Sequence, residues 1–301
     1  MKNPLVHLLT AARAWITLHR RWPGLFTLRD AALQFHRVLL PARFTHRAAA
    51  RALARHARIE PEGDAWRVTL PGHGGLVFYW PSAPDPNLWF LIEQELTPRN
   101  PHFYTTPPVR LGGESRVLDV GACEGLFAFR CLRQGLAGAV VAFEPAPVMQ
   151  ALLHRGAAAN GVAERLHLEP QAVGARCGPV RFDTAPGAEA GRIDATATGG
   201  AEVPCTTLDE YCREQGPGLT ARDLIKVDAE GADLDVLHGA ADLIRDAAPQ
   251  LAVTTYHCDA HAAAMVDWLR RTQPRYRLRL KGFAFWTPRP RPLLLQASTL
   301  P

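Results

Sequence analysis

The sequence predicts an α/β protein built on a Rossmann-like, mostly parallel sheet in which the last strand is antiparallel. Residues 116–134 have the pattern of a strand, a glycine-rich loop and a helix in succession. Further short apolar runs alternate with segments of helical periodicity, which is typical of repeated βαβ units. Several of these runs end in an acidic residue, at the edge of the sheet where ligands of such folds bind.

Residues 1–58 are predicted to form a basic helical extension. They hold eleven Lys and Arg residues and one acid, a net charge of +10, so the rest of the chain carries −5 of the total of +5. Helices are expected near residues 15–18, 30–40 and 44–58, because proline separates these segments. We expect the extension to pack as a helical cap with solvated arginines. Peripheral contact with an anionic membrane or an acidic carrier is the alternative, and no nucleic acid is expected.

Residues 59–110 are expected to lead into the sheet as short strands and loops, with a possible role as a substrate cap. Turns rich in Gly and Pro divide residues 59–79 into strands, and residues 88–96 favour a helix. Five aromatic residues lie in residues 80–108: Trp80, Trp89, Phe90, Phe103 and Tyr104. We expect them to pack against the sheet, with a role in lining a substrate mouth as the alternative. The main domain is predicted to span residues 111–301.

The first strand of this domain, Arg116–Asp119, ends in an acid and is followed by a turn that holds Gly121 and Gly125. Glycine lacks a Cβ, so the backbone there can take a positive φ or lie against a ligand. A dinucleotide loop would show three glycines as G-x-G-x-x-G, whereas this spacing is D-x-G-x-x-x-G. An acid before the first glycine repels a pyrophosphate and suits a cationic amino-acid ligand. The alternative is a buried βαβ unit whose glycines only make a turn.

A second strand, Ala139–Phe143, ends in Glu144, which is placed to accept hydrogen bonds from both hydroxyls of a ribose. An acid-and-glycine loop followed by this carboxylate fits S-adenosyl-L-methionine (SAM), which has a ribose and no phosphate. After a helix and a third strand, Gln171 stands where an adenine nitrogen would lie, with a strand-end cap as the alternative. The residues expected to bind the cofactor are Asp119, Gly121, Gly125, Glu144 and Gln171. Residues 174–203 are expected to form a hairpin with an exposed excursion at 185–200.

The chemistry is expected at the ends of the fourth and fifth strands, where Asp228, Glu230 and His257 follow apolar runs. Methyl transfer from a sulfonium is an in-line displacement, and it needs a base for the proton of the acceptor. His257 is the candidate base, because a His of near-neutral pKa suits that role. Asp228 and Glu230 would orient the acceptor hydroxyl or the His, and the helix they open would stabilise their charge. A divalent metal held by all three residues is an open alternative but not the expectation. A further alternative is that the two acids only cap the helix and that His257 is a hydrogen-bonded residue at a strand end.

Four segments occur in a fixed order within residues 117–280. They are Phe143-Glu-Pro145, Thr207-Leu-Asp209, Leu224–Ala240 with its Asp228-Ala-Glu230-Gly run, and Thr255-Tyr-His257. Together with the first glycine loop they resemble the FkbM family of SAM-dependent methyltransferases. The resemblance implies a class I methyltransferase sheet and O-methylation of sugars, polyketide products or glycan ends. Cys123 and Glu124 depart from that family's usual Asn and small or aliphatic residue.

The composition sets the class of protein and its expected compartment. The chain has 301 residues, 47% of them hydrophobic, and six cysteines of which no two have C-x-x-C spacing. Neither a zinc site nor a disulfide framework is therefore expected. No apolar run is long enough to span a membrane, and we see no secretory signal at the N-terminus. These features favour a cytoplasmic enzyme.

Two other classes of function stay open at this point. A nucleotide-sugar or NAD enzyme would need a pyrophosphate loop, and Asp119 and the missing middle glycine argue against it. A non-catalytic binding or scaffold protein would keep the SAM-binding fold and act through its basic N-terminal helices. The sequence does not choose the acceptor, because acceptor specificity lies in loops and in the extension. It also leaves the oligomeric state open.

Overall fold

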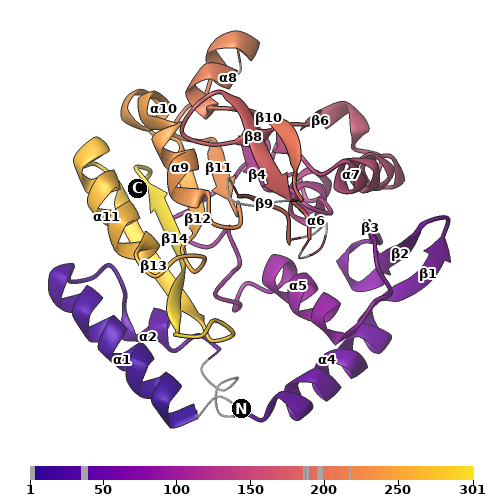
Figure 1. The fold of residues 1–301 in the computed structure, drawn as a ribbon, viewed down its shortest axis with the longest axis horizontal. Helices are drawn as coiled ribbons and strands as arrows, with labels where there is room; N and C mark the ends of the chain where they lie inside the picture. The colour runs from indigo at the N-terminus through magenta and orange to yellow at the C-terminus, as the bar shows by residue number, and fades with distance from the viewer. Residues whose placement is uncertain (1–3, 35–39, 186, 188–189, 195–198, 217) are drawn as a thin grey trace.

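A seven-stranded sheet forms the centre of the protein in the computed structural model, which describes residues 4–34, 40–185, 187, 190–194, 199–216 and 218–301. The strand order is β13-β14-β12-β11-β4-β5-β6 (Figure 1). The strands are β4 (Arg116–Val120), β5 (Ala139–Phe143), β6 (Leu166–Glu169), β11 (Leu224–Val227), β12 (Gln250–Thr254), β13 (Arg277–Ala284) and β14 (Arg291–Ser298).

The directions of these strands confirm the predicted fold class. Each pair among β6, β5, β4, β11 and β12 is parallel. The last strand, β14, is antiparallel to both of its neighbours, β12 and β13. β14 therefore lies inside the sheet rather than at its edge, a placement that the sequence did not reveal. The arrangement is that of a Rossmann-like class I methyltransferase sheet.

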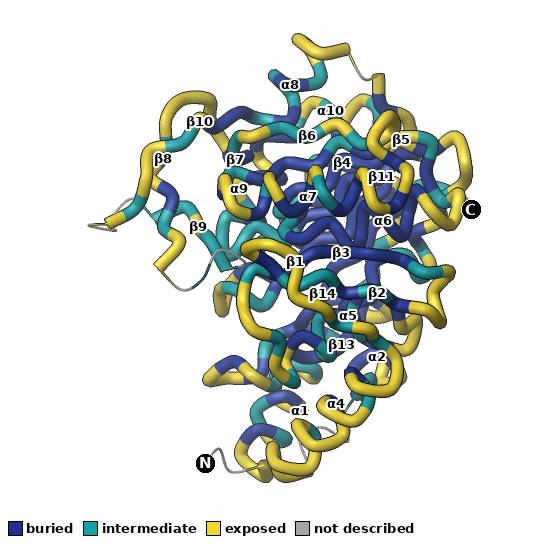
Figure 2. The backbone as a smooth tube through the Cα atoms, turned by 90° about the vertical axis from the view of Figure 1, so that its right-hand side faces the viewer, coloured by how far each residue is buried: buried dark blue, intermediate teal, exposed yellow. Residues whose placement is uncertain are grey.

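Helices cover both faces of the sheet. They are α6 (Leu126–Arg133), α7 (Pro147–Ala159), α8 (Leu208–Gln215), α9 (Asp233–His238), α10 (Ala241–Asp246) and α11 (His261–Thr272), and a 3-10 turn, η2 (Ala163–Arg165), precedes β6. Successive side chains of a strand point to opposite faces. Accordingly Val117 belongs to the core beneath α6, whereas its neighbour Leu118 belongs to the core beneath α9–α11. Figure 2 shows the resulting dark, buried strands enclosed by more exposed helices and loops.

The predicted basic extension consists of two separate pieces. α1 (Pro4–Arg21) and α2 (Leu28–Ala31) pack against the β13 end of the molecule, where Phe26 is fully buried and Arg279 pairs with Asp30. α4 (Ala42–His56) packs along α5 (Pro86–Leu96) on the other side (Figure 1). α1 is longer than predicted. Of the second predicted helix, residues 28–31 are helical, while residues 35–39 lie outside the described residues.

Residues 58–80 form a small antiparallel sheet against α7. Its strands are β1 (Arg58–Glu62), β2 (Ala65–Leu70) and β3 (Leu76–Trp80), with the 3-10 turn η1 (Pro71–His73) between the last two. The buried side chain of Asn160 fixes this sheet at the end of α7. Its Oδ1 accepts a hydrogen bond from the Val77 amide at 3.0 Å, and its Nδ2 donates to the Val77 carbonyl at 2.6 Å.

A second small sheet contains the predicted hairpin after the third strand. Its order is β7-β10-β8-β9, with β7 (Ala172–Val173), β8 (Gly178–Asp183), β9 (Arg192–Ile193) and β10 (Ala201–Thr206). β8 and β10 are antiparallel, as the hairpin prediction required. Part of the predicted excursion at 185–200 lies outside the described residues.

The helix that Glu230 was predicted to open begins later in the chain. It begins at Asp233, and it breaks at Gly239 into α9 and α10. A Cβ at Gly239 would lie 2.1 Å from the carbonyl oxygen of Gly174, so the close approach of these two backbones requires glycine. Glu230 lies before the helix, with a φ of 46°.

Among the described residues, none of the helices combines the length and the apolar character needed to cross a membrane.

Candidate active site

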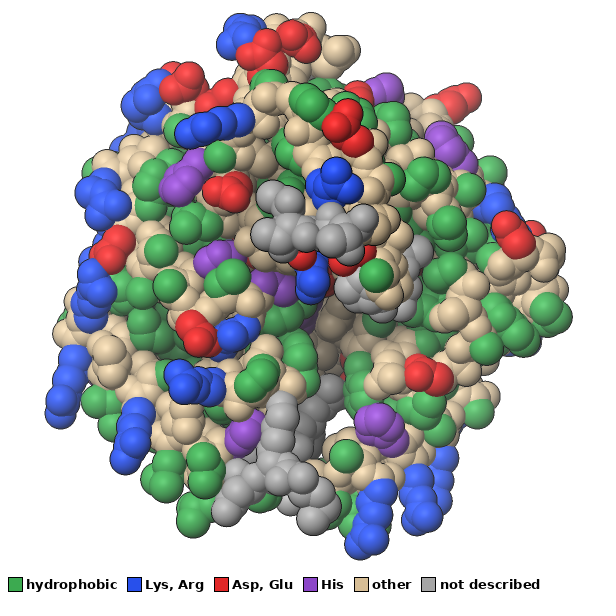
Figure 3. Space-filling model, viewed as in Figure 1, with side chains coloured by type: hydrophobic (Ala, Val, Ile, Leu, Met, Phe, Trp, Pro, Cys, Tyr) green, Lys and Arg blue, Asp and Glu red, His purple; other side chains and the backbone are tan. Residues whose placement is uncertain are grey.

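A cleft lies at the carboxyl ends of β4, β5 and β11, where ligands bind in open α/β sheets. Its empty volume, including the part open to solvent, is about 1060 Å³. Figure 3 shows a hollow in this region with His, basic and acidic side chains around it. Side chains of α5 and of the β8–β9 segment complete the walls.

The two predicted glycines have different roles. Gly121 lines the cleft with a φ of 74°, and a Cβ there would lie 1.9 Å from the carbonyl oxygen of Asp228. Gly125 also has a positive φ, but a Cβ there would meet the side chains of Leu153 and Phe129. Gly121 thus lets the loop lie against the end of β11, whereas Gly125 serves the packing of α6 on α7.

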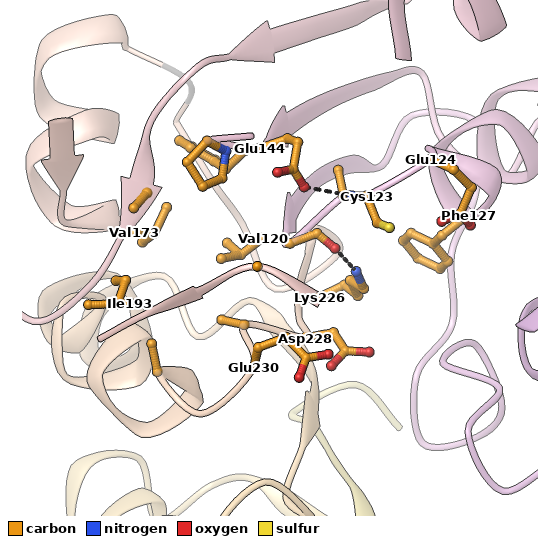
Figure 4. Close-up of a pocket in the computed structure, with 18 of the residues that line it drawn as sticks. Val120, Cys123, Glu124, Phe127, Glu144, Val173, Ile193, Lys226, Asp228 and Glu230 are labelled. Carbon is orange, nitrogen blue, oxygen red and sulfur yellow. Dashed lines mark hydrogen bonds between the residues drawn. The ribbon is translucent and has the colours of Figure 1, made fainter. Parts of the chain in front are cut away.

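Glu144 is the carboxylate that the structure holds most firmly at the cleft. Its Oε2 accepts a hydrogen bond from the Cys123 amide at 2.9 Å (Figure 4). Its Oε1 accepts one from the Ala146 amide at 2.9 Å. Each carboxylate oxygen has two lone pairs, so each keeps one for a ligand. Burial raises the pKa of Glu144 to about 7, although the two amides oppose this shift.

Cys123 departs from the usual family sequence at a position with a special backbone. Its φ is 51°, in the left-handed region where Asn is enriched several-fold among non-glycine residues. The contact that Cys123 makes with Glu144 comes from its backbone amide, which any residue except proline supplies. Cys123 in place of the usual Asn therefore makes this backbone conformation less favourable, while the hydrogen bond to Glu144 is kept.

Asp119, predicted to contact the cofactor, lies behind the glycine loop. It is fully buried and forms an ion pair with Lys226 on the neighbouring strand, with a distance of 2.8 Å from Oδ1 to Nζ. Lys226 also donates to the carbonyl oxygen of Gly121 at 2.7 Å (Figure 4). Burial alone would lower the pKa of Lys226, but the carboxylates of Asp119 and Asp228 raise it. The pair anchors the loop, and direct cofactor contact by Asp119 stays a prediction.

The far end of the cleft is mostly apolar. Gln171 lines it and donates a hydrogen bond to Glu169 at 3.1 Å. Around it lie four apolar side chains of different elements: Phe143, Val173, Phe182 and Ile193. An apolar slot with one amide suits a purine base, and the role of Gln171 toward adenine stays a prediction.

Asp228 stands at the centre of the opposite wall. Its Oδ2 accepts a hydrogen bond from the hydroxyl of Tyr104 at 2.8 Å, and lies 3.5 Å from Nε2 of His102. Its Oδ1 lies 3.6 Å from Nε2 of His257. Glu230 lines the same wall, and its Oε2 lies 3.5 Å from that same nitrogen. The structure therefore brings together the three predicted catalytic residues.

His257 is not the near-neutral base that the sequence suggested. Its Nδ1 is hydrogen-bonded to Asp233 at 2.7 Å. Burial alone would lower the pKa of His257, but the carboxylates of Asp233, Glu230 and Asp228 raise it to about 11. Without a bound cation this imidazole keeps its proton at neutral pH, because three carboxylates surround it. A role in orienting the acceptor fits this state better than proton abstraction.

The sequence analysis missed several residues of the site. Glu95 of α5 lines the cleft, and burial raises its pKa to about 8 despite the nearby Lys226 and Arg130. His102 is buried behind Tyr104, and burial lowers its pKa to about 4 against the attraction of Asp228. The available signal for Glu95 was helical spacing, because Glu95 shares the buried face of α5 with Leu88 and Ile92. An acid on such a face is rare without a partner or a function.

Three solved methyltransferase structures show a distant similarity to this chain. Methyltransferase FkbM from Methylobacillus flagellatus KT is 19% identical, with a TM-score of 0.47 over 70% of this chain and 54% of that chain. The SAM-dependent methyltransferase from Agrobacterium tumefaciens is 13% identical (TM-score 0.40; 80% and 72% covered). The O-methyltransferase from Bacillus cereus in complex with SAH is 13% identical (TM-score 0.37; 89% and 98% covered). This chain spans about half the length of the first of them.

The match to a family model is more decisive than these distant similarities. No curated protein matches the sequence significantly. Residues 119–278, more than half of the chain, match the model of the methyltransferase FkbM domain. The cofactor is S-adenosyl-L-methionine. The cleft suits it, because the carboxylate of Glu144 at the end of β5 is held by two amides and lies between the glycine loop and the apolar slot. The chain thus belongs to the FkbM family of methyltransferases.

Proposed function

We propose that this protein transfers the methyl group of S-adenosyl-L-methionine to a hydroxyl group of a sugar, a glycan or a polyketide-type small molecule. One observation carries the proposal. Asp228 and Glu230 line the same cleft as Glu144 and Gly121, and His257 lies directly behind these two carboxylates. The cofactor residues and the polar cluster thus face one space.

The residues of β4 and β5 would hold the cofactor. The two free lone pairs of Glu144 accept the ribose hydroxyls, and the slot around Gln171 takes the adenine. The bound cofactor supplies an electrophilic methyl group on a sulfonium. Its net positive charge suits a cleft that is lined by five carboxylic acids: Glu95, Glu124, Glu144, Asp228 and Glu230.

The acceptor side of the cleft favours a molecule without phosphate. Leu91, Gln94 and Glu95 of α5 form one wall with Tyr104 and Tyr256. Lys226 is the one basic side chain among the described residues that line the cleft, and Asp119 already neutralises it. An anionic acceptor would meet like charges, whereas a hydroxylated neutral molecule finds aromatic faces and hydrogen-bonding groups.

The reaction requires one bond to form, one to break and one proton to leave. The acceptor oxygen attacks the methyl carbon as the carbon–sulfur bond breaks, so the sulfonium becomes a neutral thioether. The walls must hold oxygen, carbon and sulfur in line. We assign the hydroxyl proton to the carboxylate of Asp228, which lines the cleft and is held in place by Tyr104. Glu230 and the charged His257 keep this carboxylate and the hydroxyl oriented.

The test is methyl transfer with a deuterated-methyl cofactor and a panel of hydroxylated acceptors, sugars first. We expect mass spectrometry to show a labelled methyl ether and an equal amount of S-adenosylhomocysteine. Asp228→Asn should lower kcat by about 100-fold or more, because the proton acceptor is lost, with SAM affinity nearly unchanged. Asp242→Asn, at an exposed acid of α10, is the matched control and should leave kcat unaltered. Label found only on nitrogen or carbon would contradict O-methylation.

A further inference from the structure

A histidine and several carboxylates form a compact cluster at the ends of β11 and β12. Single donor atoms of Asp228, Asp233 and His257 all lie within 4.8 Å of one another. Glu230 adds a fourth residue, since its Oε2 lies 3.5 Å from Nε2 of His257. Figure 4 shows the carboxylates of Asp228 and Glu230 near each other at the cleft.

One ring nitrogen of His257 is fixed, and the other faces the cluster. Asp233 is fully buried and binds Nδ1 at 2.7 Å, which sets the orientation of the ring. Nε2 then points to Asp228 and Glu230. A carboxylate that holds one nitrogen of a His while the other is presented to a cation is the usual support of histidine ligands in metal sites.

The distances around Nε2 leave room for a cation shared with the two carboxylates. The side chain of His257 is only 8% exposed, and its Nε2 is buried without a hydrogen-bond partner among the described residues. Its separations from Asp228 Oδ1 and Glu230 Oε2, 3.6 and 3.5 Å, exceed hydrogen-bonding distance. Ligands at about 2.1 Å from one metal ion are separated by about 3.0–3.4 Å, and these two separations are only slightly wider than that range.

The hydrogen bonds of the carboxylates show which of them is available. Asp233 is fully used, because Ala229 and Thr254 donate to its Oδ1, and Gly231 and His257 bond its Oδ2. Oδ1 of Asp228 also lies 3.2 Å from the Thr254 hydroxyl, but that group has one proton and lies nearer to Asp233, at 2.8 Å. Asp228 is therefore the freer ligand, and Asp233 is the residue that positions His257.

We propose that Nε2 of His257, Oδ1 of Asp228 and Oε2 of Glu230 bind a divalent transition-metal cation, such as Mn²⁺, at the acceptor wall of the cleft. One imidazole and two carboxylates are a donor set that suits Mn²⁺, Fe²⁺ or Zn²⁺, whereas Mg²⁺ and Ca²⁺ prefer oxygen alone. The side chain of Glu230 is 37% exposed, so the site is open toward the cleft and leaves positions for further ligands.

The role of the cation rests on the proposed function. Coordination of the acceptor hydroxyl would lower the pKa of that hydroxyl and hold its oxygen in line with the methyl carbon. The proton would still pass to Asp228, on Oδ2, because Oδ1 is a metal ligand. Metal binding displaces the proton of Nε2 to solvent, and the cation replaces the positive charge of the imidazolium among the carboxylates. The bonds formed and broken in methyl transfer are otherwise the same.

The test is direct metal binding by the full chain, freed of metal with a chelator, without cofactor or acceptor. Mn²⁺ is titrated and the free ion is followed by electron paramagnetic resonance, while Zn²⁺ is titrated by calorimetry. We expect one saturable site. Glu230→Gln and His257→Ala should each weaken Mn²⁺ binding at least about tenfold, and Asp233→Asn should weaken it about tenfold through the orientation of His257.

His238→Ala is the matched control, since His238 is an exposed histidine of α9 outside the cluster, and binding should be unchanged. Circular dichroism and SAM affinity verify that each variant is folded; Glu230→Gln, at an exposed side chain, should pass both. Absence of a saturable site for both metals would overturn the proposal, and so would binding that Glu230→Gln and His257→Ala leave unchanged. Because no methyl transfer is measured, a negative result here is distinct from failure of the proposed function.

Discussion

Replacement of Lys226 by Met removes one partner of the buried ion pair that anchors the glycine loop. Asp119 would be left fully buried without a counter-charge, and the carbonyl oxygen of Gly121 would lose its donor. Breaking a buried pair in this way costs about 3–5 kcal/mol. We expect a loss of that size in the free energy of unfolding, measured by urea denaturation at neutral pH.

Two comparisons separate this charge effect from a loss of packing. Asp119→Asn/Lys226→Met should recover much of the stability, because no uncompensated charge remains. Arg245→Met, which breaks exposed pairs with Asp242 and Asp246, should change stability little.

The loss should also depend on pH in a defined direction. Burial raises the pKa of Asp119, and in Lys226→Met the main opposing influence is gone. The folded variant then binds a proton more tightly than the unfolded chain does. The loss in the free energy of unfolding of the variant is fully present above the pKa of Asp119 in the folded state. It shrinks as the pH falls toward the pKa of Asp119 in the unfolded chain. A Lys226→Met protein within about 1 kcal/mol of the wild type at neutral pH would refute this account of the loop.

Three further predictions concern the loop, the ribose site and the N-terminal helices. Gly121→Ala should abolish SAM binding or unfold the loop, because the Cβ of the alanine would lie 1.9 Å from the Asp228 carbonyl oxygen. An undiminished SAM affinity in titration calorimetry would contradict this. SAM affinity should fall as the pH drops through about 7, where Glu144 takes up a proton and loses acceptor strength, and Glu144→Gln should lack this part of the pH profile. Leu9 and Ile16 are exposed and share a basic face of α1, so we expect the protein to co-sediment with anionic vesicles. The double variant Leu9→Glu/Ile16→Glu should bind these vesicles more weakly. Equal binding of the wild type to neutral vesicles would argue against an electrostatic contact.

The parts of the fold that the sequence predicted well are local in the chain. The strand, glycine loop and helix at residues 116–134 are specified by adjacent residues, as are Gly121 and the position of Glu144 at a strand end. Neighbouring residues also indicated α5, which begins at a capping Asp85 and Pro86.

The parts that it missed depend on residues far apart in the chain. The register of β11 on β4 sets Lys226 opposite Asp119, and a sequence does not state which strands are neighbours. Tyr104 reaches Asp228 across the sheet, 124 residues away in sequence. The break between α9 and α10 follows from the approach of Gly174 to Gly239, which only the tertiary fold determines. The charge of His257 follows in the same way from three carboxylates gathered around it.

Titration calorimetry of the purified protein with SAM, and of its Glu144→Ala variant, tests the central claim most directly. We expect one site with a Kd of about micromolar order for the wild type. Loss of the carboxylate that bonds the ribose should weaken binding at least about tenfold, or about 1.4 kcal/mol. No heat of binding at about millimolar SAM, or equal affinity in the two proteins, would contradict the assignment of the cleft.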